Sequence, residues 1–453
     1  MPRSPFFSVA ARSGLPALLS ISALFAVPAK SAEPIAAPVD AIRIPVENID
    51  GALLIKASLF RSEQADTSGL LVLDTGADYL ALDPSLMLWL GIADRKVDDM
   101  TFAPRPLRRL QVGGLQQDVV GPVLSIDVSV IQQVTDRKVL GLLGQQPLGS
   151  FAVRIDYRSD SLALIPIRRD GISATVPRRA TAADLAASGA AVAMARNASR
   201  VALGDALSVD AVGLPFDLEG DGKILVKARL GDIRENAGGE SLTLVLDTGA
   251  TKTVIFADAL THARSPMKWK QLHGLSAPTL YGTEKTYLAR VPTVTLVGGS
   301  DQVSADDVDV AVMASPLAGA LSQAVHQPVA GLLGHSFLRR FRVTIDYPHR
   351  LLWLEPLDVS RDQRRYEYSH VGIQVERHEG ALRVVAVAEG SPAAIAGVRA
   401  GDEFLAVDGT SAAALDVVSL SRKLEGPPGS RVSLCLSRGG RARSYRLPRR
   451  ELL

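Results

Sequence analysis

Two carboxylates stand at equivalent places in a repeated segment of this chain. The seven residues Leu-Val-Leu-Asp-Thr-Gly-Ala occur at 71–77 and again at 244–250, so Asp74 and Asp247 each end an apolar run. A charge at the end of an apolar strand is costly, because such a strand is normally buried. Two such carboxylates brought face to face would share one proton and could activate a water molecule between them.

The repeat extends well beyond these seven residues. Four matched blocks follow one another in the same order: 50–59 with 221–230, 71–77 with 244–250, 141–144 with 331–334, and 151–157 with 341–347. A repeat unit of this length is a domain rather than the short unit of a solenoid. The elements that must position the two Asp residues are therefore two homologous lobes. Short apolar runs between Gly, Pro and Asp turns predict that both lobes are β-rich.

These blocks resemble the aspartic peptidases, especially the retropepsin-like branch of bacteria. In that family each lobe supplies an apolar strand ending in Asp-Thr-Gly and, later, two apolar residues followed by Gly, which here correspond to 142–144 and 332–334. The resemblance covers the region from residue 40 to residue 357. It implies a mainly β fold of two acid-protease-type β-barrel lobes, and a polypeptide substrate hydrolysed by Asp74 and Asp247.

The residues that follow each Asp have supporting roles in this hypothesis. They are Thr75, Gly76 and Ala77 in the first lobe and Thr248, Gly249 and Ala250 in the second. The family resemblance implies that the two Thr side chains lock the lobe interface by hydrogen bonds. Each Gly would let backbone N–H groups approach the carboxylate, which favours its ionised form. Each Ala stands where many relatives have Ser or Thr, which removes only an outer hydrogen bond.

The chemistry expected of the pair is general acid–base catalysis. One Asp would deprotonate a water molecule as it attacks an amide carbonyl, and the other would polarise the carbonyl oxygen. This needs no covalent intermediate, metal or cofactor, and no Cys/His set in the sequence has metal-ligand spacing. The alternative is that each Asp caps a buried turn. Asp156 and Asp346 are also repeated, but each lies between Ile and Tyr, and we interpret them as structural.

The lobes differ in the stretch where a flap is expected. The separation between the candidate Asp and the next Val-Gly-Gly is 39 residues to Gly113 in the first lobe and 51 to Gly298 in the second. The longer stretch contains Tyr281 and Gly282, and a Tyr beside a Gly in a mobile hairpin could cover a bound substrate. An ordinary surface excursion is the alternative. Pepsin-like relatives carry the flap in the first lobe, so this sequence departs from their pattern.

Residues 366–453 have a sequence pattern that differs from that of the two lobes. Strand-like alternation is followed at 390–402 by Gly-Ser-Pro-Ala-Ala-Ile-Ala-Gly-Val-Arg-Ala-Gly-Asp, which predicts a short helix with an early Pro and a turn into a strand. This tail closely resembles the PDZ domains of exported bacterial proteases, which are α+β. Such a domain adds an extended peptide to a strand and holds the peptide's terminal carboxylate in a backbone nest. The residues that would bind this C-terminal peptide are Val371, Gly372, Ile373 and Val375. A helix near 412–424 would close the groove, unless the groove is blocked against the protease lobes.

Composition limits the compartment and the partners. The net charge is +2 for 453 residues, so there is no electrostatic case for a nucleic-acid partner. Arg3 and Arg12 precede a short apolar stretch, which predicts a secretory signal peptide. The single Cys435 excludes an internal disulfide, and export without disulfides favours a bacterial periplasm. A membrane is a partner only if the signal segment is retained as an anchor.

The predicted organisation has five parts. They are a signal peptide (1–32), a first lobe (40–166), a connector (167–213), a second lobe (214–357) and a PDZ domain (366–453). The leading hypothesis is an exported aspartic endopeptidase, periplasmic or secreted, with a PDZ domain for C-terminal peptide or regulatory binding. The alternative is a catalytically inactive protease-fold scaffold that acts through its PDZ domain. A homodimer that pairs like lobes is less economical, because one chain already holds two unlike lobes.

Overall fold

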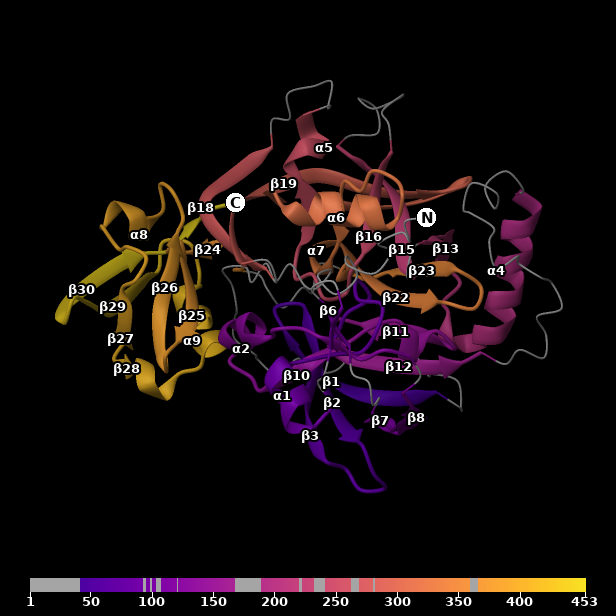
Figure 1. Ribbon diagram of the computed structural model, residues 1–453. Helices are drawn as coiled ribbons and strands as arrows, with labels where there is room; N and C mark the ends of the chain where they lie inside the picture. Colours follow the sequence, from indigo (N-terminus) through magenta and orange to yellow (C-terminus); the bar gives the residue numbers. More distant parts are fainter. Residues whose placement is uncertain are drawn as a thin grey trace, which may run out of the picture.

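The computed structural model of the chain has two β-rich lobes and a smaller C-terminal domain beside both (Figure 1). It describes residues 41–92, 95–97, 100–102, 107–119, 121–167, 189–219, 222–231, 241–261, 269–279, 282–358 and 366–453. Among these residues, no helix is long and apolar enough to cross a membrane. The predicted signal peptide lies outside the described residues.

The first lobe is built almost entirely from strands. They are β1 (Ile42–Ile49), β2 (Ala52–Phe60), β3 (Thr67–Leu73), β4 (Ala81–Leu82), β5 (Arg95–Val97), β6 (Met100–Phe102), β7 (Arg109–Val112), β8 (Leu115–Asp118), β9 (Leu124–Ser125), β10 (Val139–Leu143), β11 (Phe151–Asp156) and β12 (Ser161–Pro166). The helices are α1 (Pro84–Trp89) and α2 (Ser129–Thr135). In β7, Leu110 and Val112 are buried while Arg109 and Gln111 are partly exposed, which is the period-two pattern of a half-buried strand.

The second lobe repeats this arrangement and adds a long three-stranded extension. Its strands are β13 (Val212–Pro215), β14 (Asp217–Glu219), β15 (Lys223–Leu230), β16 (Leu242–Leu246), β17 (Thr253–Phe256), β18 (Lys270–Thr279), β19 (Gly282–Gly298), β20 (Asp301–Met313), β21 (Gly331–Leu333), β22 (Phe341–Asp346) and β23 (Leu351–Pro356). Its helices are α5 (Ala257–Thr261), α6 (Pro316–Ala324) and α7 (His335–Leu338). The extension is the hairpin β18–β19 with β20 beside it.

The Gly-Leu-Leu-Gly segment of each lobe forms a strand that lies between two other strands of the same sheet. β10 runs parallel to β3 and antiparallel to β4, and β21 has the same relation to β16 and β17. A Cβ on Gly141 would lie 1.9 Å from the carbonyl oxygen of Ala81, and one on Gly331 would lie 1.9 Å from that of Val254. No side chain fits where these strands pack against their neighbours, so the geometry requires glycine at both positions. β10 and β21 therefore fix the ends of β3 and β16, where the repeated Asp residues stand.

A single sheet joins the two lobes. β11 pairs antiparallel with β22, so β1, β12, β11, β22, β23 and β13 form one continuous run of strands. Val153 and Ile345 face each other across this junction and are fully buried. The predicted connector contributes helix α4 (Gly189–Leu203), whose Leu203 packs with Trp353 of this sheet.

The other repeated carboxylates, Asp156 and Asp346, have partners within this joint. Asp156 binds the guanidinium of Arg342 at 3.0 Å. Asp346 accepts a hydrogen bond from Ser199 of α4 and contacts Nδ1 of His349 at 2.7 Å. The bond to Arg342 links β11 of the first lobe to β22 of the second, and the bond from Ser199 attaches α4 to the shared sheet, so both carboxylates have structural partners.

The C-terminal domain has a six-stranded and a two-stranded antiparallel sheet and two helices. Its strands are β24 (Ser369–His370), β25 (Ile373–His378), β26 (Ala381–Val387), β27 (Glu403–Val407), β28 (Thr410–Ser411), β29 (Arg431–Arg438), β30 (Arg441–Pro448) and β31 (Arg450–Glu451), and its helices are α8 (Pro392–Ile395) and α9 (Val417–Leu424). Its core has the apolar sides of β25, β26 and α9 packed together. The predicted fold class, mainly β lobes followed by an α+β domain, is confirmed.

Candidate active site

The two repeated Asp residues stand at the ends of β3 and β16. The backbone N–H of Asp74 donates to the carbonyl oxygen of Leu143 in β10 at 3.0 Å, and that of Asp247 donates to Leu333 in β21 at the same distance. Asp74 is fully buried, and 3% of the surface of Asp247 is exposed. β10 and β21 therefore hold both carboxyl groups inside the protein, at equivalent positions of the two lobes.

Each carboxylate is oriented by backbone N–H groups of its own turn. In the first lobe, Gly76 and Ala77 donate to Oδ1 of Asp74 at 2.8 and 3.1 Å. The second lobe repeats both hydrogen bonds at the same distances, from Gly249 and Ala250 to Oδ1 of its own Asp. This arrangement fixes one oxygen of each carboxylate and leaves the other for chemistry.

The two Thr residues connect the lobes through a symmetric network. The N–H of Thr75 donates to Oγ1 of Thr248 at 3.1 Å, and the N–H of Thr248 donates to Oγ1 of Thr75 at 3.0 Å. Each hydroxyl in turn donates to a carbonyl of the opposite lobe at 3.0 Å, that of Leu246 or Leu73. The two turns can separate only if these buried hydrogen bonds break.

The turn of the first lobe lies directly against the carboxylate of the second. A Cβ on Gly76 would lie 2.8 Å from Cγ of Asp247, so no larger residue fits between them. Oδ2 of Asp74 is buried, and no donor from the described part of the chain reaches it. The structure thus brings the two predicted catalytic residues together at one site.

Burial and mutual repulsion change the protonation of the pair. Burial raises the pKa of Asp74 well above its usual range, and the charge of Asp247 raises it further. Burial also raises the pKa of Asp247, against hydrogen bonds from Asp74, Gly249 and Ala250. The pair therefore retains one proton over a pH range in which a free Asp is ionised, and it titrates as a unit. An acid beside a base is what general acid–base catalysis requires.

We predict that Asp74→Asn stabilises the folded protein at neutral pH. A carboxyl whose folded pKa lies above its ordinary value of 3.8 stabilises the fold below that value, and this stabilisation is lost as the pH rises through the folded pKa. Asn has the same shape and does not titrate. The melting temperature of the variant should therefore exceed that of the parent at pH 7, and the difference should shrink towards pH 4. A variant that melts lower than the parent at pH 7 would contradict the raised pKa.

A buried ion pair next to the site was not predicted from the sequence. Nζ of Lys223, on β15 of the second lobe, lies 2.9 Å from both carboxylate oxygens of Asp78 in the first lobe and donates to the carbonyl oxygen of Gly76 at 3.1 Å. The side chains are 2% and 0% exposed. The positive charge of Lys223 opposes the rise in pKa that burial causes in the carboxyl groups of Asp74 and Asp247. Ala52 stands at the matching place in the first lobe, so the repeat marks Lys223 as particular to the second lobe without identifying its partner.

Two buried tyrosines, Tyr157 and Tyr347, lie close enough to the dyad to sense its charge. Burial raises the pKa of each well above its ordinary value, and the charge of Asp247 adds to this for Tyr157 and that of Asp74 for Tyr347. The ring of Tyr157 packs edge-on against His335, with the ring centroids 5.0 Å apart. Both tyrosines follow a repeated Ile-Asp, so the repeat itself could have identified them.

The longer stretch of the second lobe docks on the C-terminal domain. Tyr281 of the candidate flap lies outside the described residues, and Gly282 begins β19. The carbonyl oxygen of His273 in β18 accepts a hydrogen bond from the N–H of Glu389 at 2.9 Å. A Cβ on Gly274 would lie 2.8 Å from the carbonyl oxygen of Val387. This part of the hairpin is therefore fixed against the neighbouring domain.

The residues predicted to form the peptide nest are engaged within the C-terminal domain. Val371, Gly372 and Ile373 are buried, and Val375 is half-buried. The N–H of Gly372 donates to Nδ1 of His370 at 2.9 Å. Burial lowers the pKa of His370 to about 3, so the ring stays neutral and can accept this bond. In this structure the Gly372 N–H is not available to a ligand.

Comparison with known protein families identifies two parts of the chain. The family model described as aspartyl protease matches residues 232–337, in the second lobe, and the model described as PDZ domain matches residues 383–438. No curated protein matches this chain. The two matches agree with the resemblances drawn from the repeated Asp-Thr-Gly segment and from the tail.

Three solved structures are similar to parts of the chain. The photosystem II D1 C-terminal processing protease is 28% identical over 21% of this chain and 26% of its own, with a TM-score of 0.19, so only about a quarter of that protease is covered. The PDZ domain of the carboxy-terminal protease from Vibrio cholerae is 17% identical over 18% of this chain and 94% of its own, with a TM-score of 0.17. The aspartic proteinase from Irpex lacteus is 14% identical over 71% of this chain and 99% of its own, with a TM-score of 0.38. By the two family matches, the chain carries an aspartyl protease domain followed by a C-terminal PDZ domain.

Proposed function

We propose that the chain is an aspartic endopeptidase that hydrolyses peptide bonds with a water molecule activated between Asp74 and Asp247. The observation that carries this proposal is the symmetry of the pair. Both carboxylates are buried, each receives the same two backbone hydrogen bonds, and a threonine network joins their turns. A protein that used this fold only to bind partners would gain nothing from burying two repelling carboxyl groups.

The chemistry follows from the unequal protonation of the two carboxyl groups. The ionised member takes a proton from the water as the water attacks the amide carbonyl carbon. The protonated member polarises the carbonyl oxygen, and the pair then protonates the leaving nitrogen. The backbone donors hold Oδ1 of each Asp, which leaves Oδ2 for the shared proton and the water.

A digest of fluorogenic peptides at acid and neutral pH, with and without a statine-type inhibitor, tests this function. The inhibitor carries a tetrahedral hydroxyl in place of the attacking water, so it should bind much more tightly than a substrate. We expect cleavage that the inhibitor suppresses. If a diverse peptide mixture shows no inhibitor-sensitive cleavage, the inactive scaffold becomes the better hypothesis.

We propose in addition that the PDZ domain serves recognition of peptides, by addition of an extended segment to the edge of β25. This edge pairs with no other strand in the described part of the chain. Capture of a free C-terminus at Val371, Gly372 and Ile373 requires a rearrangement that frees the Gly372 N–H from His370.

Export is the remaining part of the proposal, and it predicts a mature N-terminus near Lys30 or Glu33. Arg3 and Arg12, the apolar stretch from 15 to 27 and the small residues after it support cleavage there. Intact-mass measurement of protein isolated from a bacterial periplasm checks the prediction. A mass that still includes residues 1–29 would indicate an uncleaved anchor.

A further inference from the structure

Helix α2 of the first lobe lies against the groove of the PDZ domain. The groove is the space between β25 and α9, and Figure 1 shows α2 beside both elements. Val418 of α9 packs against the apolar cluster of the first lobe that contains Ile131 of α2. The part of the PDZ domain that would face a peptide ligand therefore faces the protease domain of the same chain.

The contact is centred on one carboxylate, that of Asp136 at the end of α2. Its Oδ1 accepts a hydrogen bond from Nε of Arg377 in β25 at 2.8 Å. Its Oδ2 accepts one from the backbone N–H of Val417, at the start of α9, at 3.4 Å. One carboxylate thus bridges the two walls of the groove, as an acidic peptide side chain could do.

The backbone conformation of Asp136 presents this carboxylate to the PDZ domain. Asp136 is the C-cap of α2 and has a left-handed conformation with φ of 54°. Its backbone N–H closes the helix by donating to the carbonyl oxygen of Gln132. Next to it, Arg137 binds Asp416 at 3.4 Å and Glu47 of β1 at 2.7 Å, which adds a second charged link to the first lobe.

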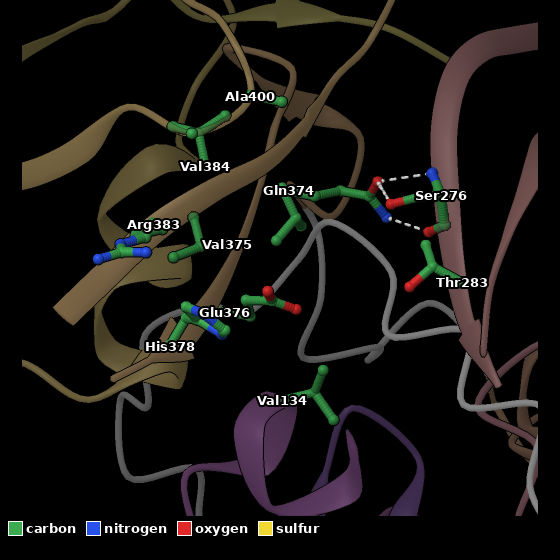
Figure 2. Close-up of a pocket in the computed structure, with 12 residues that line it drawn as sticks. Val134, Ser276, Thr283, Gln374, Val375, Glu376, His378, Arg383, Val384 and Ala400 are labelled. Carbon is green, nitrogen blue, oxygen red and sulfur yellow. Dashed lines mark hydrogen bonds between the residues drawn. The ribbon is translucent and has the colours of Figure 1, made fainter. Parts of the chain in front are cut away.

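A second set of contacts holds the PDZ domain to the other lobe. Nζ of Lys252, five residues after Asp247, lies 2.6 Å from Oε1 of Glu367 and 2.7 Å from the hydroxyl of Tyr368, and these groups are almost fully buried. The side chain of Gln374 exchanges hydrogen bonds with the backbone of Ser276 in β18 at 2.9 and 3.0 Å (Figure 2). Both anchors belong to the second lobe.

The C-terminal end of the chain adds an apolar anchor on the same side. Leu453 is fully buried and belongs to the apolar cluster that includes Val254 of the second lobe. The attachment to the second lobe is thus ionic, polar and apolar together. The attachment to the first lobe depends much more on charged side chains, with Asp136 and Arg377 at its centre.

We propose that the PDZ domain is a strap that joins the two protease lobes, with Asp136 as an internal carboxylate ligand of the β25–α9 groove. The side chains of Lys252 and Glu367 are 2% and 4% exposed, whereas those of Arg377 and Asp136 are 26% and 19% exposed. We therefore expect the PDZ domain to separate first from the first lobe, at Asp136. Any external peptide that uses this end of the groove must displace α2. The strap goes beyond the proposed hydrolysis and does not depend on it.

A cavity next to the contact lies along β25 and β26, and none of the described residues that line it belongs to α9. This cavity, of about 370 Å³, lies between Val134 of α2, Ser276 and Thr283 of the second-lobe hairpin, and β25. In Figure 2 the side chains of Glu376 and His378 lie on the side of β25 towards Val134. The first lobe therefore covers this strand without filling all the space beside it.

Amide hydrogen exchange of the full chain tests the strap. Asp136→Asn removes the charge and keeps a residue that tolerates the left-handed conformation, and Arg377→Gln removes the partner. Hydrogen bonds to charged groups contribute enough that each variant should speed exchange of the α2, β25 and α9 amides roughly tenfold or more. The two residues share one hydrogen bond, but Asp136 also accepts from Val417 and Arg377 also donates to Leu415. The double variant should therefore speed exchange by less than the product of the two single-variant factors.

Asp127→Asn is the matched control. Asp127 is exposed and lies at the other end of α2, where its carboxylate accepts a hydrogen bond from the N–H of Ser129, a bond that Asn can also make. Exchange in β25 and α9 should be unchanged in this variant. The proposal is overturned if exchange in Asp136→Asn and Arg377→Gln equals that of the parent, or if the control speeds β25 and α9 by the same factor.

Discussion

Asp74→Asn and Asp247→Asn should each lower the rate of peptide hydrolysis by about a thousandfold or more, with the fold intact. Each substitution removes the state in which one proton is shared by two carboxyl groups, so the site loses either its acid or its base. Asn keeps the shape of Asp, and its carbonyl oxygen can still accept the N–H of Gly76 or Gly249. Single-turnover rates on a well-cleaved peptide, together with melting curves, measure both parts of the expectation.

Asp156→Asn is a suitable control for these variants. Asp156 is repeated in the sequence like Asp74 and Asp247, but it binds Arg342 in the sheet that joins the lobes. Its substitution should lower the melting temperature and leave most of the turnover. Substantial hydrolysis by either dyad variant, inhibited by a statine-type compound, would show that the water is activated elsewhere.

The dyad could be predicted from the sequence because its determinants are local and occur twice. A strand ending in Asp-Thr-Gly places the carboxylate beside its own backbone N–H donors, whatever the rest of the chain does. The glycines of β10 and β21, Gly141 and Gly331, are equally local, since a Cβ at either would overlap a neighbouring carbonyl oxygen. Two copies in matched blocks then imply two facing turns.

The contacts between the parts of the chain could not be predicted in this way. Lys223 and Asp78 are 145 residues apart, and neither has a counterpart of the same type in the other lobe. Arg377 and Asp136 are 241 residues apart and join different domains. Pairings of this kind depend on how domains pack, and local sequence patterns carry no information about that packing.

The hairpin of the second lobe shows the same limit. Its extra length is visible in the sequence, and a flap over the substrate was one explanation for it. The structure gives part of that length another partner, because Ser276 binds Gln374 and His273 binds Glu389 of the PDZ domain. The extra length of the second lobe predicted an additional element. The surface that this element contacts is formed by residues about 100 positions further along the chain.

Lys223→Met should destabilise the protein by about 3–5 kcal/mol, because it leaves the carboxylate of Asp78 buried without its partner. The two side chains are almost completely enclosed, so water cannot replace the lost ion pair. Urea unfolding at neutral pH measures the change. Lys227→Met is the matched control on the same strand: Lys227 is only part-buried and binds the neutral side chain of Thr243, so its loss should cost less than about 1 kcal/mol.

The double variant Lys223→Met/Asp78→Leu separates the cost of an orphaned charge from the value of the pair. Replacing a buried ion pair by apolar residues of similar volume is often neutral or stabilising, so the double variant should be more stable than Lys223→Met alone. A double variant less stable than the single one would mean that the pair itself, and not the orphaned carboxylate, carries the energy.

The single substitution Lys223→Met should also move the pH profile of peptide hydrolysis to higher pH. Burial raises the pKa of Asp74 and Asp247, and the positive charge of Lys223 opposes that rise. Without the charge, the dyad keeps its proton to higher pH, so both limbs of the kcat/KM profile should shift upward in Lys223→Met. The Lys227→Met control should keep the parent profile. An unchanged profile in Lys223→Met, measured on folded protein, would mean that this ion pair joins the lobes without tuning the acid and base between them.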